Sequence, residues 1–486
     1  MKITVLNGSP KGDLSITMQY VAYLAKIYPQ HEFNVLHIAQ RIKRLEHDRA
    51  AFDKVIDQIR ESDAVLWGFS LYILMVHAHY KRFIELIFER GAHEAFAGKY
   101  AAAISTSIHF FDHTAHNYIH AICDDLSMRF VDSFSPNMPD LMKEEGRKQL
   151  AQFGRQFLDA VEKRAPTQRQ YPPLIDRGFS YQPELPPNPV STAGKKVVIL
   201  HDERSTDSNL ANMVARCRGA FAGEVRVVNI HDLDMKSGCL GCLECGSNYQ
   251  CAYTGKDGYI EFYRSTVMTA DVLVYAGRMV DRYLSARWKM FFDRIFFNTH
   301  TPVLVGKQVA LVISGPLGQV PNLMEIFRGF FEFQGANLVG VVGDEHGDSA
   351  DLDRQLDQLM ARAMSYAQAS YRRPHTFLGE GGMKIFRDDI YGRLRMIFPA
   401  DHRAYARMGL YKTFPQADLR QRLQNMALPL FNLPPIRKKI DKMLKKGMVV
   451  PYKQVVAKAQ SSGGVTQSVP MYEEESSDAR INGSVA

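Results

Sequence analysis

Short runs of β-branched and apolar residues alternate with amphipathic stretches along most of this chain. Ten such runs predict strands, at residues 2–6, 33–38, 63–69, 99–106, 129–134, 195–200, 224–230, 271–277, 307–314 and 337–342. Helical periodicity between them predicts helices that include residues 14–27, 76–90, 207–220 and 283–297. Strands that alternate with helices favour a parallel sheet covered by helices on both faces.

A proline-rich segment separates the ten predicted strands into two groups of five. Residues 166–194 hold 7 of the 22 prolines, a density typical of an extended linker. Five strands on each side favour an α/β fold with two tandem, flavodoxin-like, doubly wound five-stranded parallel sheets of strand order 2-1-3-4-5. The predicted divisions are a first domain at 1–165, the linker at 166–194 and a second domain at 195–372. A basic and mainly helical C-terminal arm follows at 373–460, and a flexible tail at 461–486.

The two halves also align with each other. Residues 8–17 match 201–210 at an offset of 193, whereas 62–68 match 270–276 at an offset of 208. The offset grows by 15 residues between the second and third strands, where four cysteines stand in the second half. The pattern predicts a tandem duplication in which only the second half carries a cysteine loop.

Composition is that of a globular protein, with 46% hydrophobic and 23% charged residues. The longest nearly apolar run, 64–76, is 13 residues long and too short to span a membrane. The N-terminus shows no signal-peptide pattern, so we expect a cytoplasmic location.

Most of the positive charge lies near the C-terminus. Residues 384–458 carry 17 Lys and Arg against 5 Asp and Glu, within a net charge of +8 for the whole chain, so the charge does not indicate nucleic-acid binding by the folded part. Residues 435–448 alternate Lys pairs with apolar residues; they could contact a membrane peripherally, cover another subunit, or form a solvated basic helix. Residues 379–384, GEGGMK, follow no predicted strand and are expected to be a loop.

The first strand runs into a loop rich in glycine and hydroxyl groups, and then into a helix. This arrangement directs backbone N–H groups and a helix N-terminus at one point, which suits a phosphate. The loop resembles that of the NAD(P)H-dependent FMN reductases, whose pattern G-S-x-[RK]-x-x-S-x-[TN] matches Gly8, Ser9, Lys11, Ser15 and Thr17. A second family feature is P-x-Y, followed by Lys and then by Asp-Arg. The first half keeps the Tyr of this pattern in residues 70–72, SLY, and the Lys as Lys81. The second half keeps the Lys as Lys289 and the Asp-Arg as residues 293–294.

The resemblance implies an FMN site in the first half. Ser9, Lys11, Ser15 and Thr17 would bind the phosphate, and the ring would lie against Leu71, Tyr72, Ser105, Thr106 and Ser107. The plainer interpretation of the loop is a helix N-cap and a strand-to-helix turn.

The corresponding loop of the second half is acidic. His201 and Asp202 replace Gly8 and Ser9, and Glu203 and Asp207 follow. Carboxylates repel a phosphate dianion, so we do not expect FMN in the second half.

The cysteine loop has the spacing C-x2-C-x2-C-x5-C, formed by Cys239, Cys242, Cys245 and Cys251. Four thiolates this close together can hold a [4Fe–4S] cluster. The segment resembles the cluster-binding loop of iron–sulfur flavoproteins. Zinc and free thiols are the alternatives.

Four histidines, His109, His113, His116 and His120, are spaced to share one helix face. They could bind a metal with Asp112 nearby, or form a polar pocket wall or a subunit contact.

Together these features predict an NAD(P)H-dependent FMN reductase-like oxidoreductase. It would pass electrons from a pyridine nucleotide or other donor through FMN and a [4Fe–4S] cluster to a small-molecule or protein acceptor. No side chain is singled out as catalytic, and a homo-oligomer is expected. The alternative function is a non-enzymatic electron carrier or a zinc-stapled interaction scaffold.

Overall fold

The computed structural model describes residues 1–415 and, beyond them, positions 419, 422, 423, 426, 434–436, 450 and 452. Residues Met1–Tyr411 form one compact unit, and Lys412–Ala486 form a second. Most of the predicted 435–448 helix therefore lies outside the described residues. Within the described residues, none of the helices has the length and apolar character needed to cross a membrane.

The first half contains a parallel sheet of five strands. Its order is β2-β1-β3-β5-β6, with β1 at Lys2–Asn7, β2 at Glu32–His37, β3 at Ala64–Tyr72, β5 at Tyr100–Thr106 and β6 at Arg129–Phe134. A short strand, β4 (Met75–Val76), turns back antiparallel on β3. This is the predicted order 2-1-3-4-5, with each strand close to its predicted range.

The second half repeats this arrangement. Its order is β10-β8-β11-β12-β13, with β8 at Val197–His201, β10 at Val225–Asn229, β11 at Val272–Arg278, β12 at Gln308–Ser314 and β13 at Asn337–Gly343. A small pair, β7 (Val190–Ser191) and β9 (Phe221–Ala222), lies outside this sheet. The predicted fold class, two flavodoxin-like α/β sheets, is confirmed.

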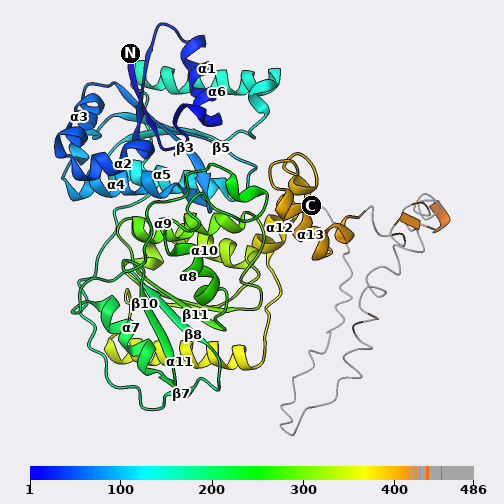
Figure 1. Cartoon of the computed structure of the whole chain (residues 1–486). Coiled ribbons are helices and arrows are strands. Elements are labelled where there is room, and N and C mark those ends of the chain that lie inside the picture. Colours follow the sequence, from blue (N-terminus) through cyan, green and yellow to red (C-terminus); the bar gives the residue numbers. More distant parts are fainter. Residues whose placement is uncertain are drawn as a thin grey trace, which may run out of the picture. The chain divides into compact units, whose positions relative to one another are not determined.

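Helices cover both faces of each sheet (Figure 1). The outer face of the first sheet carries α1 (Ile16–Ile27) and α6 (Glu144–Glu162); its other face carries α2 (Ile38–His47), α3 (Arg49–Arg60), α4 (Ala78–Glu89) and α5 (Asp112–Asp125). The outer face of the second sheet carries α7 (Asn209–Gly219) and α11 (Ser349–Gln368); its inner face carries α8 (Tyr259–Phe262), α9 (Ala286–Arg294) and α10 (Pro321–Phe333). Helices α4 and α5 face α9 and α10 across the middle of the unit.

The inner faces of the two sheets share one hydrophobic core. Trp67 and Phe83 of the first half belong to the same buried cluster as Tyr275, Phe292 and Phe331 of the second. Each outer face has its own separate cluster. The proline-rich linker is also packed, since Tyr181 within it is fully buried. Shared burial of this kind explains why both halves lie in one compact unit.

Helices α4 and α9 join the halves through a reciprocal polar contact. The backbone N–H of Ala78 donates to Asp293 (2.7 Å), and that of Ala286 donates to Glu85 (2.6 Å). The two donors, Ala78 and Ala286, are related by the 208-residue offset seen in the sequence, and so are the two acceptors, Glu85 and Asp293. The contact therefore has the form of a two-fold interface within one chain.

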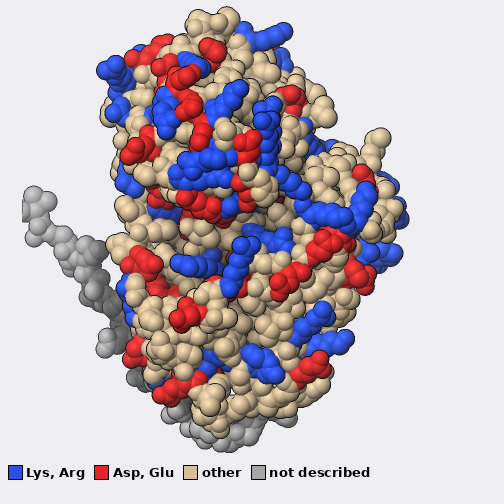
Figure 2. All heavy atoms as spheres, turned by 60° about the vertical axis from the view of Figure 1, so that its left-hand side comes forward, with Lys and Arg blue, Asp and Glu red and all other residues tan. Residues whose placement is uncertain are grey.

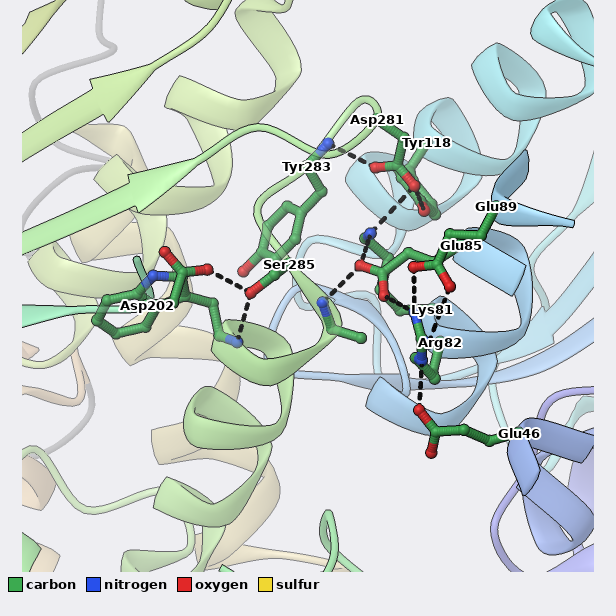
Figure 3. Close-up of polar contacts among 12 residues, drawn as sticks. Glu46, Lys81, Arg82, Glu85, Glu89, Tyr118, Asp202, Asp281, Tyr283 and Ser285 are labelled. Carbon is green, nitrogen blue, oxygen red and sulfur yellow. Dashed lines mark hydrogen bonds and ion pairs between the residues drawn. The ribbon is translucent and has the colours of Figure 1, made fainter. Parts of the chain in front are cut away.

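Buried ion pairs reinforce this contact (Figure 3). Lys81 is fully buried and pairs with Glu85 (2.7 Å) and with Asp281 of the second half (3.0 Å). Its burial lowers its pKa, but Asp281 and Glu85 outweigh that effect, so the pKa of Lys81 is raised. Each half thus supplies one carboxyl partner to the buried Lys81 ammonium.

The chain after α11 adds α12 (Phe377–Tyr391), α13 (Pro399–Arg407) and a 3-10 turn at Leu410–Thr413. The expected loop at 379–384 is wrong, because this segment lies inside α12. Its glycines permit close packing on the rest of the unit: a Cβ on Gly382 would lie 2.3 Å from the ring of Phe110. On the face in Figure 2, basic and acidic side chains are interspersed.

Candidate functional site

The predicted phosphate loop lies at the carboxyl edge of the first sheet. It joins β1 to α1 through a short 3-10 helix, Gly12–Leu14. Ser15 is the N-cap residue of α1, yet its hydroxyl accepts no N–H from the helix. Its hydroxyl lies 3.5 Å from that of Ser70, so the N-terminus of a twelve-residue helix and two hydroxyls stand together, which suits an anion.

The second predicted loop follows β3 and is a tight hairpin into β4. Tyr72 pairs with Met75, so Ile73 and Leu74 form the two-residue turn. Their φ angles are 42° and 59°, a left-handed conformation that glycine or asparagine normally occupies in such turns. Lys289 of α9 donates to the Tyr72 carbonyl (2.9 Å), and Thr114 of α5 donates to that of Leu74 (2.6 Å). The strained turn is thus held from both halves.

These two loops border a pocket of about 320 Å³, which is within the usual size of small-molecule sites. The predicted residues that line it are Lys11, Ser15, Leu71, Tyr72, Thr106 and Ser107. Burial, with Cys239 and Asp293 nearby, raises the pKa of Tyr72 well above its usual value, so its hydroxyl is neutral.

Three predicted residues lie behind the pocket wall. The Ser9 hydroxyl accepts from Ser70 (3.0 Å), and that of Thr17 lies 2.9 Å from the Thr106 hydroxyl. The Ser105 hydroxyl lies 2.8 Å from His116 Nε2. Their side chains hold the wall in place from within the core.

The other side of the pocket is built from the second half, from α12 and from the segment between α12 and α13, which sequence reasoning missed. Its aromatic members are Phe296, His300, Phe330, Phe333, Phe386 and Phe398. They come from segments far apart in the chain, and no local pattern marks them. The pocket is therefore closed only by the folded whole of residues 1–411.

The cysteine loop meets the phosphate loop and the Tyr72 loop directly. Gly241, between Cys239 and Cys242, has φ +64°, and a Cβ there would lie 2.2 Å from the Tyr72 hydroxyl and 2.8 Å from Lys11 Cε. In addition, His77 Nε2 lies 2.7 Å from the Cys239 carbonyl oxygen. The second half thus brings its cysteines to the edge of the pocket of the first.

All four cysteines of the loop line one small cavity, which shares Leu243 and Phe296 with the larger pocket. None is in a disulfide. Burial raises the pKa of Cys245 to about 12 and that of Cys239 further, so both are thiols as the chain stands. Among the described residues, no three His, Cys, Asp or Glu side chains are arranged to hold a metal ion. The four cysteines therefore share one cavity, and thiolates are the ligands that iron–sulfur clusters take.

In the second half, a carboxylate occupies the loop that is equivalent to the phosphate loop. Glu203 accepts from the N–H groups of Arg204 and Ser205 and from the Ser208 hydroxyl, all at 2.8 Å. A carboxylate thus takes the loop donors that a phosphate would need. Residues 175–179 of the linker line the adjacent pocket.

The four predicted histidines do not converge. His113 contacts Glu325 of the second half (2.8 Å), His116 contacts Ser105, and His120 stacks on Phe130. His109 precedes α5 and contacts Asp112 (3.0 Å). They serve packing and the contact between halves.

Comparison with known proteins bears on the first half. Residues 1–137 match the sequence model of the NADPH-dependent FMN reductase family. No curated protein matches the chain.

Among solved structures, the flavoenzyme NAD(P)H:(acceptor) oxidoreductase FerB from Paracoccus denitrificans is 22% identical, covering 33% of this chain and 97% of its own, with a TM-score of 0.29. General stress protein 14 from Treponema denticola, solved in complex with FMN, is 13% identical, covering 33% of this chain and 98% of its own, with a TM-score of 0.25.

Proposed function

We propose that this chain is a flavin-dependent oxidoreductase that passes electrons from NADH or NADPH through FMN to a small-molecule or protein acceptor. The pocket bordered by the phosphate loop and the Tyr72 loop carries this proposal, because both loops lie in residues 1–137, which match the FMN reductase family. When bound, FMN would accept a hydride and release electrons one at a time.

In this proposal the chain's own residues bind and orient the flavin. Lys11 and Ser15 bind the phosphate at the N-terminus of α1, while Leu71, Tyr72, Thr106 and Ser107 contact the ring. Ser9, Thr17 and Ser105 act as supports behind them. Glu203 blocks the corresponding loop of the second half, so we propose one FMN per chain.

We further propose that Cys239, Cys242, Cys245 and Cys251 hold a [4Fe–4S] cluster. Four thiols around one cavity supply the ligands that such a cluster takes. The loop abuts Tyr72 and Lys11, so electrons would pass between cluster and flavin within one chain.

An absorption spectrum of the full chain, purified without oxygen and then titrated with NADPH or NADH, tests the function. Flavin bands that bleach with the nucleotide support the reductase; bands that bleach only with dithionite indicate a carrier, and absence of flavin contradicts both. Iron and acid-labile sulfide near four atoms each per chain support the cluster. Zinc in their place, or no metal, contradicts it.

A further inference from the structure

A histidine stands in the aromatic wall of the pocket, opposite the loops of the first half. His300 follows the 3-10 helix Ile295–Asn298 of the second half and lines the pocket. Its ring stacks on Phe386 (centroids 4.3 Å apart) and meets Phe398 edge-on (4.6 Å). It is 8% exposed, so the ring is largely shielded from solvent.

One carboxylate of α13 fixes this ring. Asp401 is fully buried and lies 2.9 Å from His300 Nδ1. It also accepts from the His300 backbone N–H (3.1 Å) and from the hydroxyls of Thr301 (2.8 Å), Tyr249 (3.3 Å) and Thr299. A carboxylate only accepts, so Nδ1 carries a proton toward Asp401. Nε2 forms no hydrogen bond within the described part of the chain and is the nitrogen that a bound molecule can reach.

The backbone beside His300 is strained. Thr299 has φ 50° and ψ −116°, a conformation that is unfavourable for a β-branched residue. The bonds from the Thr299 hydroxyl and the His300 N–H to Asp401 hold this conformation. Such strain is typical of functional sites where a side chain is held in one orientation.

We propose that His300 gives a proton to the electron acceptor in this pocket, and that Asp401 is its positioning residue. This inference rests on the proposed function and concerns acceptors whose two-electron reduction takes up a proton, such as a planar carbonyl compound. The acceptor receives a hydride from the reduced FMN, which is thereby oxidised. The N–H bond at Nε2 of the protonated ring breaks, an O–H bond forms on the acceptor, and the ring regains a proton from water.

The proton step can be separated from electron transfer by the choice of acceptor. In the full chain loaded with FMN, His300→Gln should leave bleaching by NADPH unchanged. Reoxidation by ferricyanide, which takes one electron and no proton, should also be unchanged. Reoxidation by 1,4-benzoquinone should slow by about 10²–10⁴-fold, the usual contribution of a general acid. Equal slowing with both acceptors, or none with either, would overturn the proposal.

Two further variants sharpen the test. Asp401→Asn should give the same selective loss, since its amide no longer orients the ring. His113→Gln, which removes a histidine of α5 that does not line the pocket, should match the unmodified chain. If the unmodified chain neither binds FMN nor bleaches with nucleotide, the proposed function has failed, and the role of His300 is then decided by the following measurement.

A readout without flavin comes from ¹⁵N-histidine spectra of the FMN-free full chain. Nδ1 of His300 should carry a proton, and Asp401→Asn should lower the share of rings that are protonated there. A ring protonated only at Nε2 in the unmodified chain would contradict the inference.

Discussion

Ser15 shows how a single charge can test the phosphate site. It caps α1 without donating to or accepting from the helix. Asp and Asn are both good N-cap residues, so either substitution preserves the helix. Ser15→Asp sets a carboxylate against the phosphate at a cost of about 1–4 kcal/mol per pair of charges. We therefore expect FMN affinity, measured by fluorescence titration, to fall about ten- to a thousandfold in Ser15→Asp and little in Ser15→Asn. Equal affinities would remove this loop as the phosphate site.

Gly241 shows how closely the cysteine loop approaches the flavin pocket. An added Cβ would clash with the Tyr72 hydroxyl, whereas Gly255, also at positive φ (+72°), has no atom within 4 Å of such a Cβ. Both Gly→Ala substitutions should cost about 1–2 kcal/mol of unfolding free energy from backbone strain. Only Gly241→Ala should also weaken FMN binding, by about tenfold or ~1.4 kcal/mol. Titrations in which both variants bind FMN alike would show that the loop does not shape the pocket.

His79 makes stability depend on pH. It lies between the Ala39 carbonyl oxygen and the Ser237 hydroxyl, each at 2.9 Å, and burial lowers its pKa to about 3. Between pH 6.5 and 3 the unfolded chain takes up a proton at this residue while the folded chain does not. This residue's contribution to stability therefore falls by about 1.4 kcal/mol per unit as pH decreases through that range. We expect the unfolding free energy, measured by urea titration at a series of pH values, to change less steeply with pH in His79→Gln, by that amount per pH unit. The exposed control, His93→Gln, should keep the slope of the unmodified chain; equal slopes in all three would contradict the assignment.

At the scale of elements, α4 and α9 are equivalent in sequence but not in role. Lys81 pairs with Glu85 and Asp281, whereas Lys289 pairs with Asp293 and also donates to the Tyr72 carbonyl. Either Lys→Met substitution leaves buried carboxylates unpaired, at about 3–5 kcal/mol of stability. Only Lys289→Met releases the strained turn at Ile73 and Leu74, so only this variant should lose FMN affinity. FMN titrations and unfolding curves of the two variants, measured in parallel, test this difference. Equal loss of FMN affinity in both would mean that other contacts hold the turn.

The elements predicted from sequence are those with local causes. Each sheet strand is a short apolar run. The loop from β1 to α1 is contiguous, so its resemblance to a family pattern could single out Lys11 and Ser15, which line the pocket. Residues 379–384 were misjudged because three glycines disfavour a helix, while the packing of Gly382 on Phe110 overrides that preference. Phe296, His300 and Phe398 reach the pocket only through tertiary packing, which no local pattern records.

At the scale of the whole molecule, the shared core decides how the two proposed cofactors should be tested. The inner faces of both sheets belong to one buried cluster, so separating the halves would expose that surface to water. Substitutions in the full chain avoid this problem. Ser15 lies in the first half, and Cys242 and Cys251 lie in the second. Neither cysteine is in the core of the fold, since Cys242 is exposed and Cys251 is half-buried.

We expect the two cofactors to be lost independently. Ser15→Asp should purify with iron and sulfide but with little FMN. The pair Cys242→Ser and Cys251→Ser should retain FMN while losing iron, because serine replaces two of the four thiolate ligands. FMN content by absorbance and iron by elemental analysis measure both losses in the same samples. Loss of both cofactors in the Ser15→Asp variant, at unchanged thermal stability, would mean that the groups share one site rather than two adjoining ones. The close contact of Gly241 with Tyr72 joins the two sites, but their ligands come from different halves, so each site should fill without the other.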